Sequence, residues 1–62
     1  MLDKEFETVP EGMEKLKNAV SIRNQMGGAL YWNICQGDCE IIAKKLFNMG
    51  ADESTVYSVI KS

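Results

Sequence analysis

The sequence has no histidine, the residue that most often serves enzymes as a general acid or base. Many nucleophile–base pairs are thereby removed as well, because histidine is the usual base beside a catalytic serine or cysteine. The acidic residues lie mostly near the N-terminus and at predicted helix starts, where capping and the helix dipole account for them. We therefore expect a protein that is not an enzyme, with no catalytic residues and no cofactor.

Cysteine is also scarce, and the chain has only Cys35 and Cys39. A tetrahedral zinc site needs four ligands, so two thiols in one chain do not predict a metal site. We interpret Cys39 as a small core residue and Cys35 as an incidental neighbour. Gly27 and Gly28 do not belong to a phosphate-binding loop, because the longer glycine pattern and its lysine are missing.

No long hydrophobic run is present. The uncharged stretch from Asn24 to Gly37 is too short and too mixed in composition to span a bilayer. The start, MLDKEFETVPEG, is acidic and lacks the apolar centre of a signal peptide. We therefore expect a cytoplasmic protein without a membrane partner, whose thiols stay reduced.

The chain of 62 residues has 45% hydrophobic and 26% charged residues, which is the composition of a single globular domain. Residues 1–14 carry five acidic residues against one lysine, a balance of −4, whereas residues 15–62 carry a balance of +2. We expect an N-terminal acidic arm over residues 1–8, with Phe6 docking back, and a helical domain over 9–62. The arm is also a candidate for binding a basic partner.

The first helix is predicted to begin at Thr8, because Thr8 and Glu11 have the spacing of a reciprocal capping pair and Pro10 suits a first turn. From Met13 to Ile34, one helical winding collects a single apolar sector, which favours a continuous or only kinked helix. The sector contains Leu16, Ala19, Val20, Met26, Gly27, Leu30 and Ile34. Each glycine inside this helix would cost about 1 kcal/mol relative to alanine.

Two further helices are predicted after Gly37. Gly37 is placed to end the first helix, and Asp38 to cap a second one that runs to Gly50. Asp52 is predicted to cap a third helix that reaches the C-terminus. The expected fold is an all-α, small three-helix domain with a long first helix, then a helix-turn-helix pair.

The segment IIAKKLFNMGADESTVYSVIKS resembles the helix-turn-helix of resolvase-type DNA-binding proteins, with its turn at Gly50. The resemblance implies a DNA-binding regulator that uses residues 39–61 and places the helix from about Glu53 in the major groove. Leu46 departs from the family's small residue at that position, and Asp52 would repel phosphate. The shorter segment GADESTVYSVI is similar to part of an annexin repeat.

Trp32 lies about 160° from Leu30 and Ile34 on a continuous helix, so it does not share their core. In a first alternative, a kink at the glycines turns Trp32 toward the core. In a second, the third helix or the Phe6 arm covers Trp32. Tryptophan is enriched at binding hot spots. We expect a protein–protein interaction module, a homodimer or a stoichiometric regulator of another protein. The candidate contact residues are Trp32, Tyr31, Gly28, Ile22 and Ile41.

Overall fold

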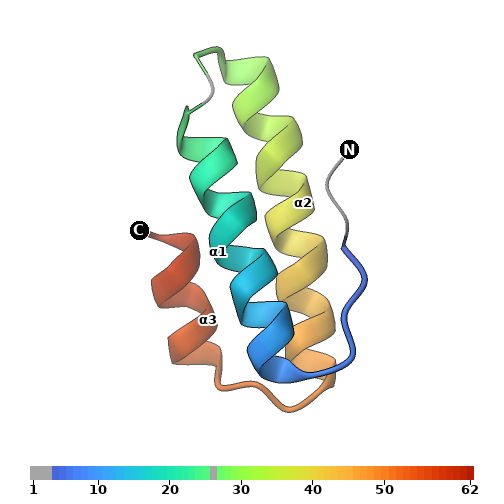
Figure 1. The fold of residues 1–62 in the computed structure, drawn as a ribbon. Helices are drawn as coiled ribbons and strands as arrows, with labels where there is room; N and C mark the ends of the chain where they lie inside the picture. The colour runs from blue at the N-terminus through green and yellow to red at the C-terminus, as the bar shows by residue number, and fades with distance from the viewer. Residues whose placement is uncertain (1–3, 26) are drawn as a thin grey trace.

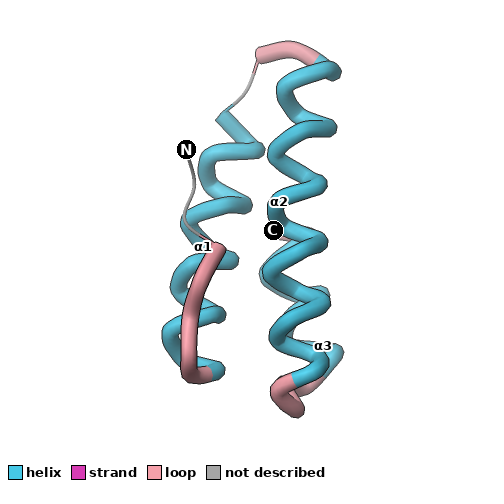
Figure 2. The backbone as a smooth tube through the Cα atoms, turned by 90° about the vertical axis from the view of Figure 1, so that its right-hand side faces the viewer, coloured by secondary structure: helices cyan, strands magenta, loops and turns pink. Residues whose placement is uncertain are grey.

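The computed structural model describes residues 4–25 and 27–62 and contains three helices. Helix α1 (Val9–Gln25) and helix α2 (Ala29–Asn48) form an antiparallel hairpin, and α3 (Glu53–Ile60) lies against this pair (Figure 1). No strand occurs in the described residues (Figure 2). The prediction of an all-α three-helix fold is confirmed.

Helix α1 begins where its capping residues predict. The side-chain oxygen of Thr8 accepts a hydrogen bond from the Glu11 amide at 3.3 Å, and the Glu11 carboxylate accepts one from the Glu7 amide at 3.5 Å. Pro10 lies in the first turn of α1. Amide groups in a first turn have no carbonyl partner within the helix, so the missing amide proton of proline costs no helical hydrogen bond.

The prediction of one continuous helix through Gly27 and Gly28 is wrong. Helix α1 ends at Gln25, and Gly28 has the extended conformation (φ −136°, ψ 148°) of the residue that precedes α2. Met26, which the sequence pattern places in the apolar sector, lies outside the described residues. The physical reason is tertiary packing: reversing the chain here lets α1 and α2 cover each other's apolar faces, which one straight helix cannot do.

The predicted stop at Gly37 and start at Asp38 are also wrong, because α2 continues through both residues. The Asp38 carboxylate does not cap a helix and instead pairs with the Lys4 ammonium at 3.1 Å. A glycine inside a helix costs about 1 kcal/mol relative to alanine, which is less than the packing that the full length of α2 provides.

The turn before α3 follows its sequence signals. Gly50 has a φ of +90°, the left-handed conformation that favours glycine. The Asp52 carboxylate accepts hydrogen bonds from the Thr55 amide at 3.0 Å and from the Thr55 hydroxyl at 2.9 Å. The predicted cap of the third helix is therefore confirmed.

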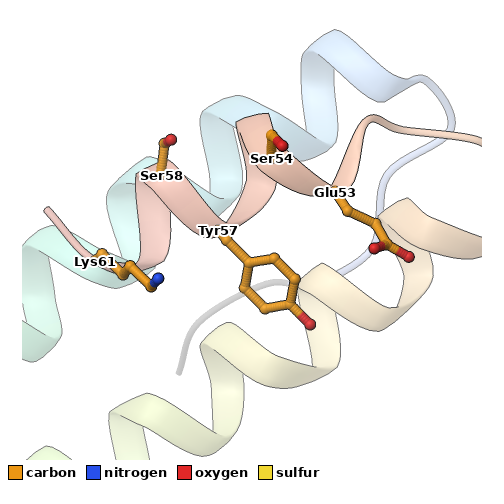
Figure 3. Close-up of a pocket in the computed structure, with 5 residues that line it drawn as sticks. All are labelled: Glu53, Ser54, Tyr57, Ser58 and Lys61. Atoms are coloured by element: carbon orange, nitrogen blue, oxygen red, sulfur yellow. The ribbon is translucent and has the colours of Figure 1, made fainter.

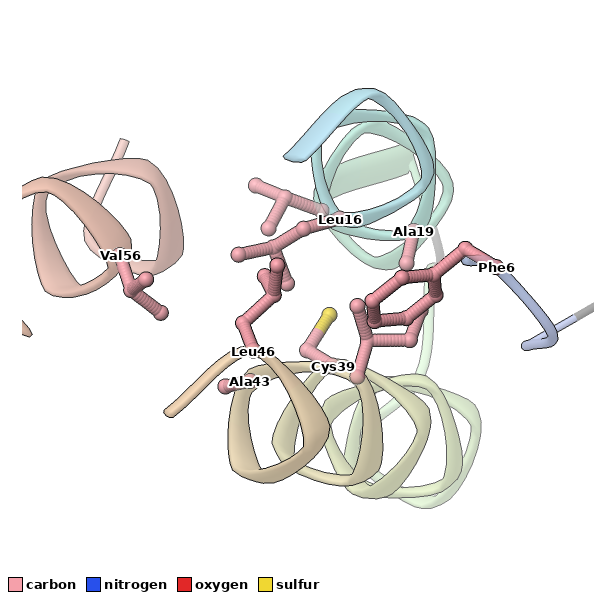
Figure 4. Packing of buried hydrophobic residues seen from close by; sticks show 9 residues of the cluster. Phe6, Leu16, Ala19, Cys39, Ala43, Leu46 and Val56 are labelled. Carbon is pink, nitrogen blue, oxygen red and sulfur yellow. The ribbon is translucent and has the colours of Figure 1, made fainter. Parts of the chain in front are cut away.

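The core is formed between α1 and α2, and it is closed on one side by α3 and on the other by the N-terminal segment (Figure 4). Val56 reaches it from α3, and Phe6 reaches it from the opposite side and is only 4% exposed. The predicted docking of Phe6 is confirmed. The buried hydrophobic residues are Phe6, Leu16, Ala19, Val20, Cys39, Ile42, Ala43, Leu46 and Val56.

Candidate protein-binding surface

Trp32 faces α1 and is not the centre of an exposed surface. The guanidinium carbon of Arg23 lies 5.1 Å from the centre of the indole ring, which is a cation–π arrangement. The residue remains 39% exposed. The shortness of α3 explains this partial exposure, because a helix of 8 residues cannot extend along the whole of the longer α1–α2 hairpin (Figure 1).

Arg23 is the buried charged residue of this region, with 5% of its surface exposed. Its guanidinium donates hydrogen bonds to the Gln36 side-chain oxygen at 2.7 Å and to the Asn24 side-chain oxygen at 3.0 and 2.8 Å. No carboxylate pairs with it among residues 4–25 and 27–62. Neutral amides and the indole therefore solvate this cation in place of water.

Leu30 and Ile34, expected in the core, are among the most exposed apolar side chains of the described residues. Leu30 is 69% exposed and Ile34 is 57% exposed. The break at Gly27 and Gly28 is the cause. The predicted apolar sector assumes one continuous helix, and after the break the residues of α2 no longer continue the apolar face of α1. The side of α2 that carries Trp32 turns toward α1, and the side that carries Leu30 turns to solvent.

The structure does not gather the five candidate contact residues into one surface. Trp32 and Ile41 are nine residues apart on α2, which places them about 180° apart around the helix and about 13.5 Å apart along it. Tyr31 is 62% exposed at the start of α2, and Ile22 is 39% exposed on the other helix, α1. Gly28 belongs to the exposed link between the helices.

A different apolar surface emerges on α2, and we name it the outer seam. It consists of Leu30, Ile34, Gly37 and Ile41, whose spacing of four, three and four residues keeps them on one face of a helix. Three of these residues each lie nine positions before a core residue, which puts them about 180° from the core side. The core residues so related are Cys39, Ala43 and Leu46.

The outer seam lies largely in the uncharged part of the chain, residues 24–37. All four charged residues of α2 follow this stretch: Asp38, Glu40, Lys44 and Lys45. Depletion of charge around exposed apolar residues is typical of the centre of a protein interface. The sequence signal for the seam is its heptad-like spacing. The assumption of a continuous first helix hides this signal, because it assigns Leu30 and Ile34 to the core and ends the helix at Gly37.

Helix α3 carries a shallow hollow of about 360 Å³ on its exposed side (Figure 3). Its lining residues all come from this one helix and the residue after it, so no second element encloses a ligand. Tyr57 leans toward α2, where its ring centre is 5.5 Å from that of Phe47. Glu53 and Lys61 give this face one charge of each sign, which is not the basic surface typical of a DNA-binding helix.

The Cys39 thiol lies in the core, as expected. Burial raises its pKa above the ordinary value of a cysteine, and the nearby Arg23 charge opposes that effect. Cys39 is therefore a neutral thiol at physiological pH, a form that is a poor nucleophile and a poor metal ligand. Within the described residues, no group of three or more potential metal ligands comes together.

Comparison with known proteins gives no match to a family model, a curated protein or a solved structure. The helices formed by the described residues include none with the length and apolarity needed to cross a membrane.

Proposed function

We propose that this chain is a non-enzymatic, cytoplasmic protein–protein interaction module that binds through the outer seam. The observation that carries the proposal is the exposure of three large aliphatic side chains in one row on α2: Leu30 at 69%, Ile34 at 57% and Ile41 at 54%. A row of this kind differs from the scattered single hydrophobic residues of ordinary protein surfaces.

The length of α2 supports the proposal. Helix α2 has 20 residues, yet the third helix has 8 and leaves part of the hairpin without a neighbour. The seam also lies on the side of α2 opposite to the one that packs on α1, so binding would not require the domain to open. A helix face of this spacing is suited to packing against another helix.

The proposal is tested by photo-crosslinking from the seam in the protein's native cells. A benzophenone amino acid at position 34 is expected to give one main protein adduct, because the side chain at this position points away from the core. The control places the same group at Asn18, an exposed position on α1. Equal labelling from both positions, or no adduct from position 34, would contradict the proposed function.

A further inference from the structure

We propose that the partner of the outer seam is a second copy of this chain, bound through antiparallel packing of the two α2 helices. The two-fold axis passes between positions 35 and 36, which is the midpoint of the seam. This inference rests on the proposed function and specifies its partner.

The register follows from the spacing of the seam itself. With the axis between 35 and 36, Leu30 of one copy lies opposite Ile41 of the other, and Ile34 lies opposite Gly37. Every layer of the contact then contains a large aliphatic side chain. Because the axis is two-fold, each layer occurs twice, as an isologous dimer requires.

Gly37 supplies an independent reason for close helix packing. A Cβ atom added at this residue would meet nothing within 4 Å in its own chain. Its backbone has no positive φ, since Gly50 is the glycine with that conformation among the described residues. Neither packing nor backbone geometry within the chain therefore requires glycine at this position of α2. In the dimer, Ile34 of the second copy occupies the space that a side chain would fill.

Charge favours the antiparallel arrangement over a parallel one. In the antiparallel register, Asp38 and Glu40 of one copy face the uncharged positions 33 and 31 of the other, and Lys44 and Lys45 extend beyond the first residue of the other α2. Like charges thus do not meet along the contact. A parallel pair in register would bring Asp38 of one copy near Glu40 of the other, and Lys45 near Lys44. Like charges across a helix interface oppose association.

The size of the contact predicts a weak dimer. The seam extends over 11 residue steps, about 16.5 Å of helix. The whole chain has 4172 Å² of accessible surface, and a standard interface of about 800 Å² per partner would take roughly a fifth of it. A single helix pair of this length buries less than the standard area, so we expect a dissociation constant in the micromolar range.

Sedimentation equilibrium of the full chain tests this inference. The wild type is expected to show a monomer–dimer equilibrium, and Ile34→Glu is expected to remain monomeric because it brings carboxylates into the apolar contact. Gly37→Ala is expected to raise the dissociation constant at least about tenfold. The same substitution should shift the urea midpoint of the dilute monomer upward, since alanine is the better helix former.

Two control variants make the test specific. Asn18→Ala changes helix propensity on α1, and Trp32→Ala removes the ring that faces Arg23; both are expected to dimerise like the wild type. A wild type that stays monomeric at millimolar concentration, or Gly37→Ala that dimerises as tightly as wild type, would overturn the inference. Position 34 would then still crosslink a different protein if the proposed function holds, so the two failures are distinguishable.

Discussion

Replacing Phe6 by alanine is expected to lower the free energy of unfolding by about 3–5 kcal/mol. The ring is 4% exposed and fills the space above Gly12, where an added Cβ would fall on the ring and would lie 2.7 Å from Leu46. The Lys45 ammonium also lies 4.6 Å from the centre of the ring. A domain of this size has a total stability of about 3–9 kcal/mol, so the loss approaches complete unfolding. Urea denaturation followed by circular dichroism measures it.

The matched control for Phe6 is the exposed Glu7 next to it. Glu7→Ala is expected to change the free energy of unfolding by no more than about 0.5 kcal/mol, as is usual for surface substitutions. A Phe6→Ala loss as small as that of Glu7→Ala would show that the N-terminal segment does not belong to the core.

Replacing Arg23 by alanine is expected to lower the free energy of unfolding by about 2–4 kcal/mol. The change removes the cation from the Trp32 ring and leaves the side-chain oxygens of Gln36 and Asn24 without their donor. Chemical denaturation monitored by the fluorescence of Trp32 follows both the stability and the surroundings of the indole.

Arg23→Met separates the charge from the packing of the side chain. Methionine keeps most of the buried aliphatic volume, whereas alanine removes it and leaves a cavity. We therefore expect Arg23→Met to be clearly less destabilising than Arg23→Ala. Equal losses for the two variants would mean that the hydrogen bonds and the cation–π contact, not the volume, determine the effect.

Local signals in the sequence predict much of the fold. The start of α1 follows from Thr8 and Glu11, and the start of α3 follows from Asp52, because a side-chain cap depends on residues three positions apart. Phe6 is recognisable as a core residue because it is an aromatic residue in an otherwise charged arm. Cys39 is recognisable because it lies on the apolar face of the helix predicted from Asp38.

The position of the hairpin turn depends on tertiary packing, which the sequence pattern does not reveal. Gly27–Gly28 and Gly37–Asp38 both carry the composition of a helix boundary, and the structure uses only the first. The site of the turn also decides which side chains of α2 point toward α1 and which point to solvent. With the turn placed at Gly37, Leu30 and Ile34 are assigned to the core, whereas the observed turn leaves them exposed.

The place of the turn also decides where the candidate contact residues lie. Ile41 lies on the outer seam, because its exposed position follows from the pattern of α2 itself. Trp32 points away from Leu30 on α2, as the helical spacing of the two residues predicts. The side of α2 that faces α1 could not be deduced without the place where the chain turns back.

The central claim is that the chain reverses at Gly27 and Gly28, so that Trp32 faces α1 and the outer seam faces outward. NMR of the full chain tests it through nuclear Overhauser effects between the indole protons of Trp32 and the side chain of Arg23. The account predicts these effects, since the guanidinium carbon lies 5.1 Å from the ring centre. In a continuous helix the two residues would be about 13.5 Å apart along the axis. Their absence, together with helical contacts running unbroken from residue 24 to residue 30, would contradict the account.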